Sequence, residues 1–156
     1  MIDLTTLRGK RLAAFDYGMA RIGVAVCDEF HIVVSTRPVI VNDAATIWTS
    51  IQERLAADRI DVLLVGVPRR HDDQKTEIIE RIEAFIEELR TRIAIPVMPV
   101  DEAFSTKRAR ELMLVTGMKK KRRQTKGTKD VVAAAIILQD FLKELDYLPK
   151  PPSTSP

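Results

Sequence analysis

Acidic residues stand at three places where an apolar segment ends or begins. Asp16 ends one such segment, Asp101 and Glu102 follow another, and Asp130 opens an amphipathic segment near the C-terminus. In an open α/β sheet, ligands collect at the ends of strands. Carboxylate oxygens gathered there are the ligands that Mg²⁺ or Mn²⁺ prefers, and a pair of such ions promotes phosphodiester hydrolysis. The three positions therefore indicate a divalent-metal site that acts on phosphodiesters.

Each acid also has an ordinary structural explanation when it is taken alone. Aspartate is common in turns after strands, and an acid in the first turn of a helix favours the helix dipole, as Asp130 would. Asp101 and Glu102 are adjacent, so on an extended strand their side chains face opposite ways and only one is expected to enter the site. The functional interpretation depends on the three positions occurring together.

A basic segment leads directly into Asp130. Seven of the eleven residues from 119 to 129 are Lys or Arg and none is acidic. Such a segment attracts phosphates by charge, and because it contains no aromatic residue it suits the nucleic-acid backbone rather than the bases. A solvated loop is the alternative. The candidate nucleic-acid-binding residues are Arg21, which opens the second apolar segment, and Lys119, Lys120, Lys121, Arg122, Arg123, Lys126 and Lys129.

Alternating and helical patterns of apolar residues predict the elements that position these groups. Strands are expected at 11–16, 21–27, 32–41, 61–66 and 95–100, and helices at 43–58, 78–89, 106–115 and 129–145. The first two strands read as a hairpin, Pro38 suits an edge strand, and the nearly continuous apolar run 61–66 suggests the central strand. Asn42 or Asp43 is the expected cap of the first helix. The fold class is α/β, with a mixed sheet of about five strands and helices on both faces.

Length and composition favour one domain. The chain has 156 residues, of which 46% are hydrophobic and 30% charged, so we expect a single domain over 1–148 and a disordered tail over 149–156. Cys27 is the only cysteine, which excludes an intramolecular disulfide and suits a reducing compartment. The sequence shows neither a membrane span nor a signal peptide, so a cytoplasmic protein is expected, as a monomer or a homodimer.

Four ordered motifs resemble the YqgF/RuvX family. They are Asp16-Tyr17-Gly18 with 21–25, the segment 65–68, Val100-Asp101-Glu102 with Ser105-Thr106, and Lys129-Asp130 before 133–139. Together they cover roughly residues 9–145. The resemblance implies a ribonuclease H-like fold related to Holliday-junction resolvases, a site for Mg²⁺ or Mn²⁺, and a nuclease that matures the 5′ end of pre-16S ribosomal RNA.

The resemblance also implies which acids act. Carried over by motif, the catalytic and metal-binding residues are Asp16, Glu102 and Asp130, with Asp101 as a possible further ligand. The chain departs from the family at Ala103, Phe104 and Ser105, where the family usually has Arg, Leu and Thr. The lost arginine removes a cation that could contact phosphate, so this departure predicts a weaker grip on the substrate.

Several functions share these features. An endonuclease on structured RNA and a resolvase of branched DNA need the same carboxylates, and sequence does not choose between them. A catalytically weak nucleic-acid-binding or transcription-associated module is conceivable because of the altered segment after Glu102, although the three metal acids are retained. A sugar-kinase-like or actin-like ATPase also carries an Asp-x-Gly turn, but it needs two such domains, and this chain is too short for them.

Overall fold

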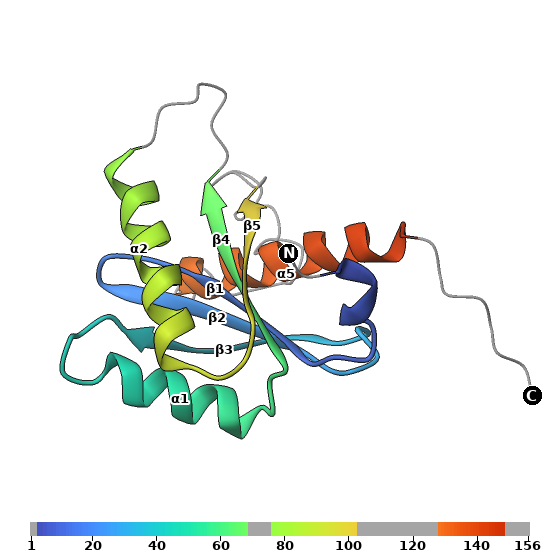
Figure 1. The fold of residues 1–156 in the computed structure, drawn as a ribbon, viewed down its shortest axis with the longest axis horizontal. Coiled ribbons are helices and arrows are strands. Elements are labelled where there is room, and N and C mark those ends of the chain that lie inside the picture. Colours follow the sequence, from blue (N-terminus) through green and yellow to red (C-terminus); the bar gives the residue numbers. More distant parts are fainter. Residues whose placement is uncertain (1–2, 69–75, 103–127, 149–156) are drawn as a thin grey trace, which may run out of the picture.

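The computed structural model describes residues 3–68, 76–102 and 128–148, with side chains in the last range described from residue 132 onward. Figure 1 shows a sheet covered by helices on both faces. The strands are β1 (Leu12–Asp16), β2 (Arg21–Cys27), β3 (Val34–Val41), β4 (Val62–Pro68) and β5 (Val97–Glu102). The helices are the 3-10 helix η1 (Leu4–Leu7) and the α-helices α1 (Ile47–Ala57), α2 (Glu77–Arg92) and α5 (Thr128–Asp146).

The five strands lie in the order β3-β2-β1-β4-β5. The pairs β1–β2 and β2–β3 are antiparallel, whereas β1–β4 and β4–β5 are parallel, so the sheet is mixed as expected. β3 is an edge strand, which accommodates Pro38. The prediction that 61–66 forms the central strand was wrong, because β1 is central and β4 lies between β1 and β5. An apolar run reports burial on both faces of a sheet and does not report strand order.

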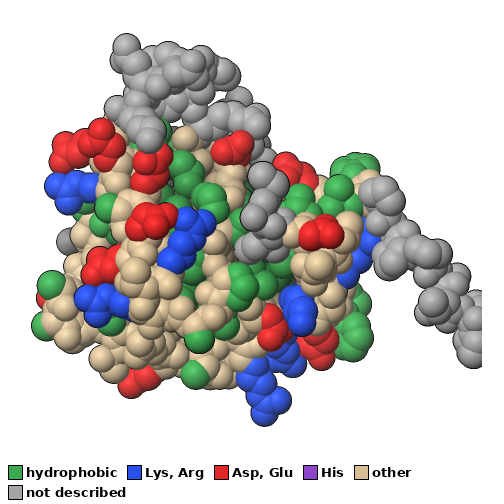
Figure 2. All heavy atoms as spheres, viewed as in Figure 1, with side chains coloured by type: hydrophobic (Ala, Val, Ile, Leu, Met, Phe, Trp, Pro, Cys, Tyr) green, Lys and Arg blue, Asp and Glu red, His purple; other side chains and the backbone are tan. Residues whose placement is uncertain are grey.

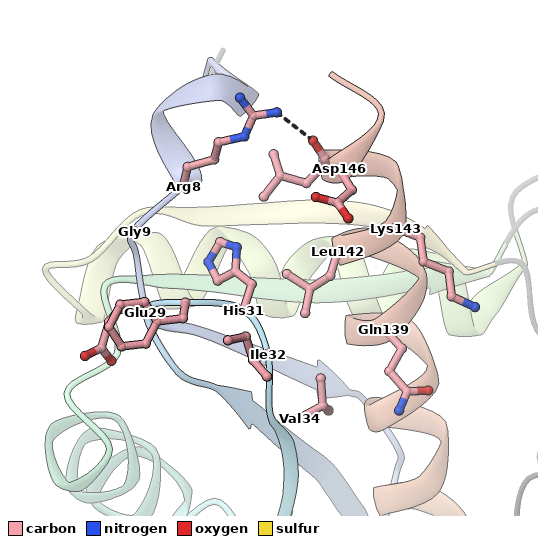
Figure 3. Close-up of a pocket in the computed structure, with 12 residues that line it drawn as sticks. Arg8, Gly9, Glu29, His31, Ile32, Val34, Gln139, Leu142, Lys143 and Asp146 are labelled. Carbon is pink, nitrogen blue, oxygen red and sulfur yellow. Dashed lines mark hydrogen bonds between the residues drawn. The ribbon is translucent and has the colours of Figure 1, made fainter. Parts of the chain in front are cut away.

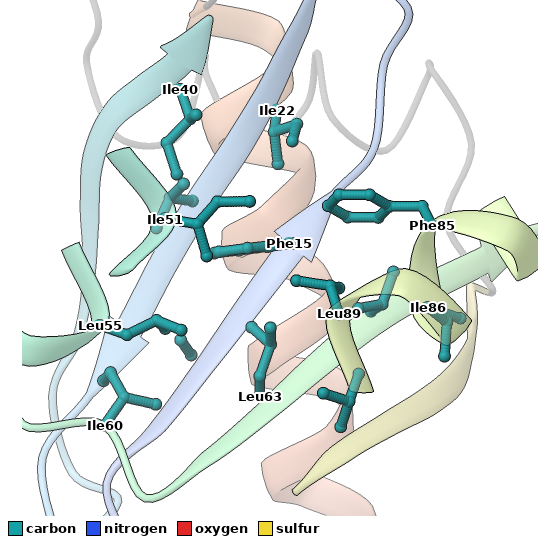
Figure 4. Close-up of a cluster of buried hydrophobic side chains, with 14 of the residues drawn as sticks. Phe15, Ile22, Ile40, Ile51, Leu55, Ile60, Leu63, Phe85, Ile86 and Leu89 are labelled. Atoms are coloured by element: carbon teal, nitrogen blue, oxygen red, sulfur yellow. The ribbon is translucent and has the colours of Figure 1, made fainter. Parts of the chain in front are cut away.

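Two apolar layers hold the helices to the sheet. On one face, Phe15 and Leu63 pack with α1 and α2, as Figure 4 shows. On the other face, Leu64 packs with α5. Ala14 and Ala25 are register partners on β1 and β2 and are fully buried in this second layer. Their small side chains let α5 approach the middle of the sheet closely.

Most predicted elements are present, with shifted ends. α1 begins at Ile47 rather than near 43, and its N-cap is Thr46, without a side-chain cap hydrogen bond. Asn42 is not a cap, because its Nδ2 donates to the Gly18 carbonyl oxygen at 2.8 Å. β5 extends to Glu102, so this acid belongs to the strand instead of following it. The 3-10 helix η1, which buries Leu7, was not predicted.

Some predictions lie outside the described residues. These are the helix at 106–115, the basic segment up to residue 127, and the disordered tail at 149–156. Within the described ranges, no helix is both long enough and apolar enough to cross a membrane. Cys27 is buried, at 4% exposure, as its apolar neighbours suggested.

Candidate active site

The strands β1, β4 and β5 run parallel, so their carboxyl ends lie on the same side of the sheet. Phe15 on β1 is the register partner of Val65 on β4, so Asp16 is level with Gly66. Gly66 is in turn the partner of Val100 on β5, and Pro68 is the partner of Glu102. Asp16 therefore lies two strands from Glu102, and Glu102 lies two residues farther along the strand direction.

Both acids point to the face that α5 covers. Successive residues of a strand face opposite sides of the sheet, so Asp16 shares the face of Ala14, and Glu102 shares that of Val100. Gly66 follows the same alternation from Leu64. Asp101 has the opposite alternation and is exposed. Of the two adjacent acids, Glu102 is thus the one that shares a face with Asp16, and the two side chains face opposite ways as expected.

The Glu102 side chain is half-buried and lies over β4. A Cβ atom built at Gly66 would be 3.4 Å from Glu102 Oε2, which places this carboxylate against the backbone of the intervening strand. Burial and, as the smaller cause, the negative charge of Asp16 together raise the pKa of Glu102 to about 8. Two carboxylates that destabilise each other's charged forms are a suitable donor set for a divalent cation, which would relieve both effects.

The turn after Asp16 is held from two sides. The Asn42 backbone N–H donates to the Ala20 carbonyl at 3.0 Å, in addition to the side-chain bond to Gly18. The Tyr17 ring packs against Phe85 of α2, with ring centroids 4.9 Å apart. A Cβ at Gly18 would lie 2.5 Å from the Arg21 carbonyl oxygen, so only glycine fits this turn. Sequence reasoning missed Asn42, because the same residue type before a helix resembles a cap.

Arg21 and Asp130 have defined places in the backbone. Arg21 lies on β2, next to β1, and by strand alternation shares the α5 face with Ala25 and Cys27. Gly23 is the register partner of Asp16. Because β2 is antiparallel to β1, Arg21 lies two residues past Asp16 in the direction of β1. Asp130 is in the first turn of α5, two turns before Ile137. The structure describes its backbone and not its side chain. The same holds for Lys129, and Lys119 to Lys126 lie outside the described residues.

The described side chains alone do not complete a metal site. Among them, no three His, Cys, Asp or Glu residues are grouped so as to hold an ion. A separate hollow of about 780 Å³ lies near the C-terminal end of α5, lined by residues that include Arg8, His31 and Leu142 (Figure 3). None of the strand-end acids lines it. The carboxylates instead lie where β1 and β5 end.

Comparison with solved structures defines the class of fold. The chain is similar to the Fowlpox virus resolvase solved with Holliday junction DNA (TM-score 0.56, 13% identity, 86% of this chain and 98% of that one). It is also similar to Thermus thermophilus RuvC solved with a Holliday junction substrate (TM-score 0.54, 16% identity, 88% and 97%). These similarities show the ribonuclease H-like fold of the resolvases, as predicted.

Sequence comparison identifies the family. Residues 10–144 match the model of RuvX, described as a Holliday junction resolvase, and the chain belongs to this family. A relative from Phocaeicola vulgatus is 36% identical over 88% of this chain and 99% of its own length. A relative from Chlorobium chlorochromatii is 33% identical over 86% and 96%. Both bear the name "Putative pre-16S rRNA nuclease". The family resemblance is thus confirmed, and the family is one of nucleases.

Proposed function

We propose that this protein is a divalent-metal-dependent endonuclease that processes the 5′ end of pre-16S ribosomal RNA in the cytoplasm. The observation that carries the proposal is the placement of Asp16 and Glu102 on one face at the ends of β1 and β5, close enough for the charge of Asp16 to raise the pKa of Glu102. Membership of a nuclease family and the names of the relatives support the reaction and the substrate.

Asp16 and Glu102 would hold Mg²⁺ or Mn²⁺ together with Asp130 from the first turn of α5. When bound, the cation supplies an activated water and stabilises the charge that develops on the leaving oxygen. The two described acids lie on paired strands, and the turn after Asp16 is bonded to Asn42, so the backbone that carries these carboxylates is ordered before an ion binds. Pre-organised ligands of this kind avoid the entropic cost of ordering the site during the reaction.

The cations of the chain would hold the substrate. Arg21 lies on the same face of the sheet as Asp16, where its guanidinium suits a phosphate of the backbone. The basic segment 119–129 precedes Asp130 in the chain, so phosphates that it attracts would be delivered toward the metal acids. Asp101 is exposed on the opposite alternation of β5, which makes it the weaker candidate ligand.

Branched DNA is the second candidate substrate. The family description is Holliday junction resolvase, and the two solved structures of similar fold contain Holliday junction DNA. Both substrates present phosphodiesters to the same carboxylates. The replacement of the family's arginine by Ala103 lowers the expected grip on either one.

One experiment tests the reaction and separates the substrates. The purified protein is incubated with 5′-extended pre-16S RNA and with a four-way DNA junction, each with Mg²⁺, with Mn²⁺ or with EDTA. We expect cleavage of the RNA and not of the junction, and we expect it to depend on metal. Asp130→Asn should abolish this cleavage, whereas Asp101→Asn should not. Preferential cleavage of the junction would replace the RNA proposal with the resolvase. Binding without cleavage under any metal condition would contradict both and favour the inactive binding module.

A further inference from the structure

Glycine is needed at position 66 because a side chain would have too little space there, and not because the backbone conformation requires glycine. It lies within β4 and has no left-handed φ, so its backbone is open to any residue. A Cβ atom there would be 2.6 Å from Ile137 Cδ1 of α5 and 3.4 Å from Glu102 Oε2. The first distance is a collision, and the second is direct contact with the carboxylate. The space above Gly66 is therefore bounded by a core side chain and by an acid.

This space lies on the route that joins the two acids. Neighbouring strands are about 4.8 Å apart, so β1 and β5 are about 10 Å apart with β4 between them. Asp16 is level with Gly66, and Glu102 reaches over the backbone of Gly66 from the other side. A side chain on this face of β4 would stand between the carboxylates.

We propose that Gly66 is a positioning residue of the metal site, whose missing side chain lets the Glu102 carboxylate lie across β4 toward Asp16. The inference rests on the proposed function, since it assumes that these acids hold the cation. Gly66 touches neither the cation nor the substrate in this scheme. Any side chain at this position occupies the side of the carboxylate from which the ion is shared with Asp16.

A purely structural role would involve Ile137 only. In that case glycine is needed because α5 packs closely, and any substitution lowers stability without a specific effect on the metal. The two explanations separate if the collision with Ile137 is removed while the contact with Glu102 is kept. Ile137→Val does this, because it deletes Cδ1, the one atom of the described residues that is closer than 3.4 Å to the added Cβ.

The test compares Gly66→Ala, Ile137→Val and the double variant with the wild-type protein. The double variant exchanges one methyl group for another about 2.6 Å away, so the volume of the core is nearly conserved. Melting temperature reports packing, and Mn²⁺ affinity by isothermal titration calorimetry reports the site without requiring cleavage. Glu102→Gln and Asp16→Asn serve as reference variants for the metal site.

We expect Gly66→Ala to lower the melting temperature and the double variant to restore most of it. Mn²⁺ affinity should stay at the wild-type level in Ile137→Val and fall about 10-fold to 100-fold in the double variant, as for other residues that orient metal ligands. Wild-type affinity in a double variant of restored stability would overturn the proposal and leave Gly66 a packing residue. A double variant that regains no stability would also overturn it, because among the described residues Ile137 Cδ1 is the one atom that the added Cβ would meet closer than 3.4 Å.

The reference variants separate this failure from that of the proposed function. If Glu102→Gln and Asp16→Asn bind Mn²⁺ as the wild type does, the metal site itself is misassigned. If both lose affinity while the double variant keeps it, only the role of Gly66 is wrong.

Discussion

Carboxylates occur in two very different settings in this molecule, at the strand ends and along α2. Several glutamates of α2 form exposed ion pairs with arginines of the same helix, such as Arg81–Glu77 at 3.0 Å and Arg92–Glu88 at 3.1 Å. Figure 2 shows acidic and basic side chains interspersed over this helix. Glu102 is half-buried instead, and the causes that raise its pKa are burial and a second carboxylate. Under the proposed function, burial and like charge, rather than the number of acids, distinguish the strand-end carboxylates from those of α2.

The largest effect is expected on cleavage activity, which should depend on the acids at the strand ends and not on those of α2. Asp16→Asn should reduce metal-dependent cleavage by about 100-fold or more, because it removes a ligand charge from the site. The metal-free protein should be as stable as the wild type or slightly more so, since repulsion with Glu102 is relieved. Cleavage assays and thermal melts on one preparation measure both. Glu87→Gln on α2 is the matched control and should change neither, whereas full activity of Asp16→Asn would refute the assignment.

The next effect contrasts the basic segment with the acidic surface of α2. Replacing Lys120, Arg122 and Arg123 with Gln should weaken nucleic-acid binding about equally across sequences. Each phosphate contact contributes about 0.9 to the slope of log K against log salt for duplex and about 0.7 for single strands, so the slope should flatten by up to roughly two to three units. Binding titrations at several salt concentrations measure it. An unchanged affinity and slope would make the segment a solvated loop.

The pH dependence of stability sharpens the comparison further. The folded-state pKa of Glu102 is about 8, above the ordinary value of 4.5, so the folded protein binds this proton more tightly than the unfolded chain does. The stabilisation is full below about pH 4.5 and is lost as the pH rises toward 8. Because the half-exposed group is screened by solvent, we expect the free energy of unfolding of the metal-free protein to fall by about 1–2 kcal/mol over this interval.

Denaturant unfolding at pH 5, 6.5 and 8 in EDTA measures this change. Glu102→Gln should flatten the dependence, and saturating Mn²⁺ should counteract the loss at pH 8 because it favours the ionised carboxylate. A Gln variant that keeps the full wild-type slope would assign the pH dependence to another group.

Local features of the sequence predicted β1 and β2 closely, placed β5 two residues too early at both ends, and did not predict how the strands pair. The apolar runs around Gly18 predicted β2 over its full length and β1 to within one residue. The start of α1 was misplaced because Asn42 bonds to a turn that is distant in sequence, and local preference cannot reveal such a partner. The placement of Asp16 and Glu102 on either side of Gly66 depends on the register of three strands. The roles of Asp16, Glu102, Asp130 and the basic segment stay predictions.

A smaller effect is expected at the turn that holds Asp16. Asn42→Ala deletes the 2.8 Å bond to Gly18 and leaves the backbone bond to Ala20, so the protein should lose about 1 kcal/mol of stability. Mn²⁺ affinity should fall several-fold, since the turn no longer fixes Asp16 as tightly. Asp43→Ala is the neighbouring control, because its side-chain bonds are long, at 3.4 and 3.5 Å. Equal Mn²⁺ affinity in both variants would remove Asn42 from the site.

The smallest effect is expected for substitutions on α2. The contrast with the strand-end acids predicts that the acids of this helix have no role in catalysis. Glu77 and Arg81 are i,i+4 partners with side chains 80% and 46% exposed, so solvent screens their attraction. A double-mutant cycle with Glu77→Gln and Arg81→Gln should give a coupling energy of about 0.3–0.5 kcal/mol, and it should shrink in high salt. Mn²⁺ affinity should not change in any member of the cycle. A loss of metal affinity in Glu77→Gln would mean that exposed, arginine-paired acids also serve the site, and burial with like charge would then no longer distinguish the two settings.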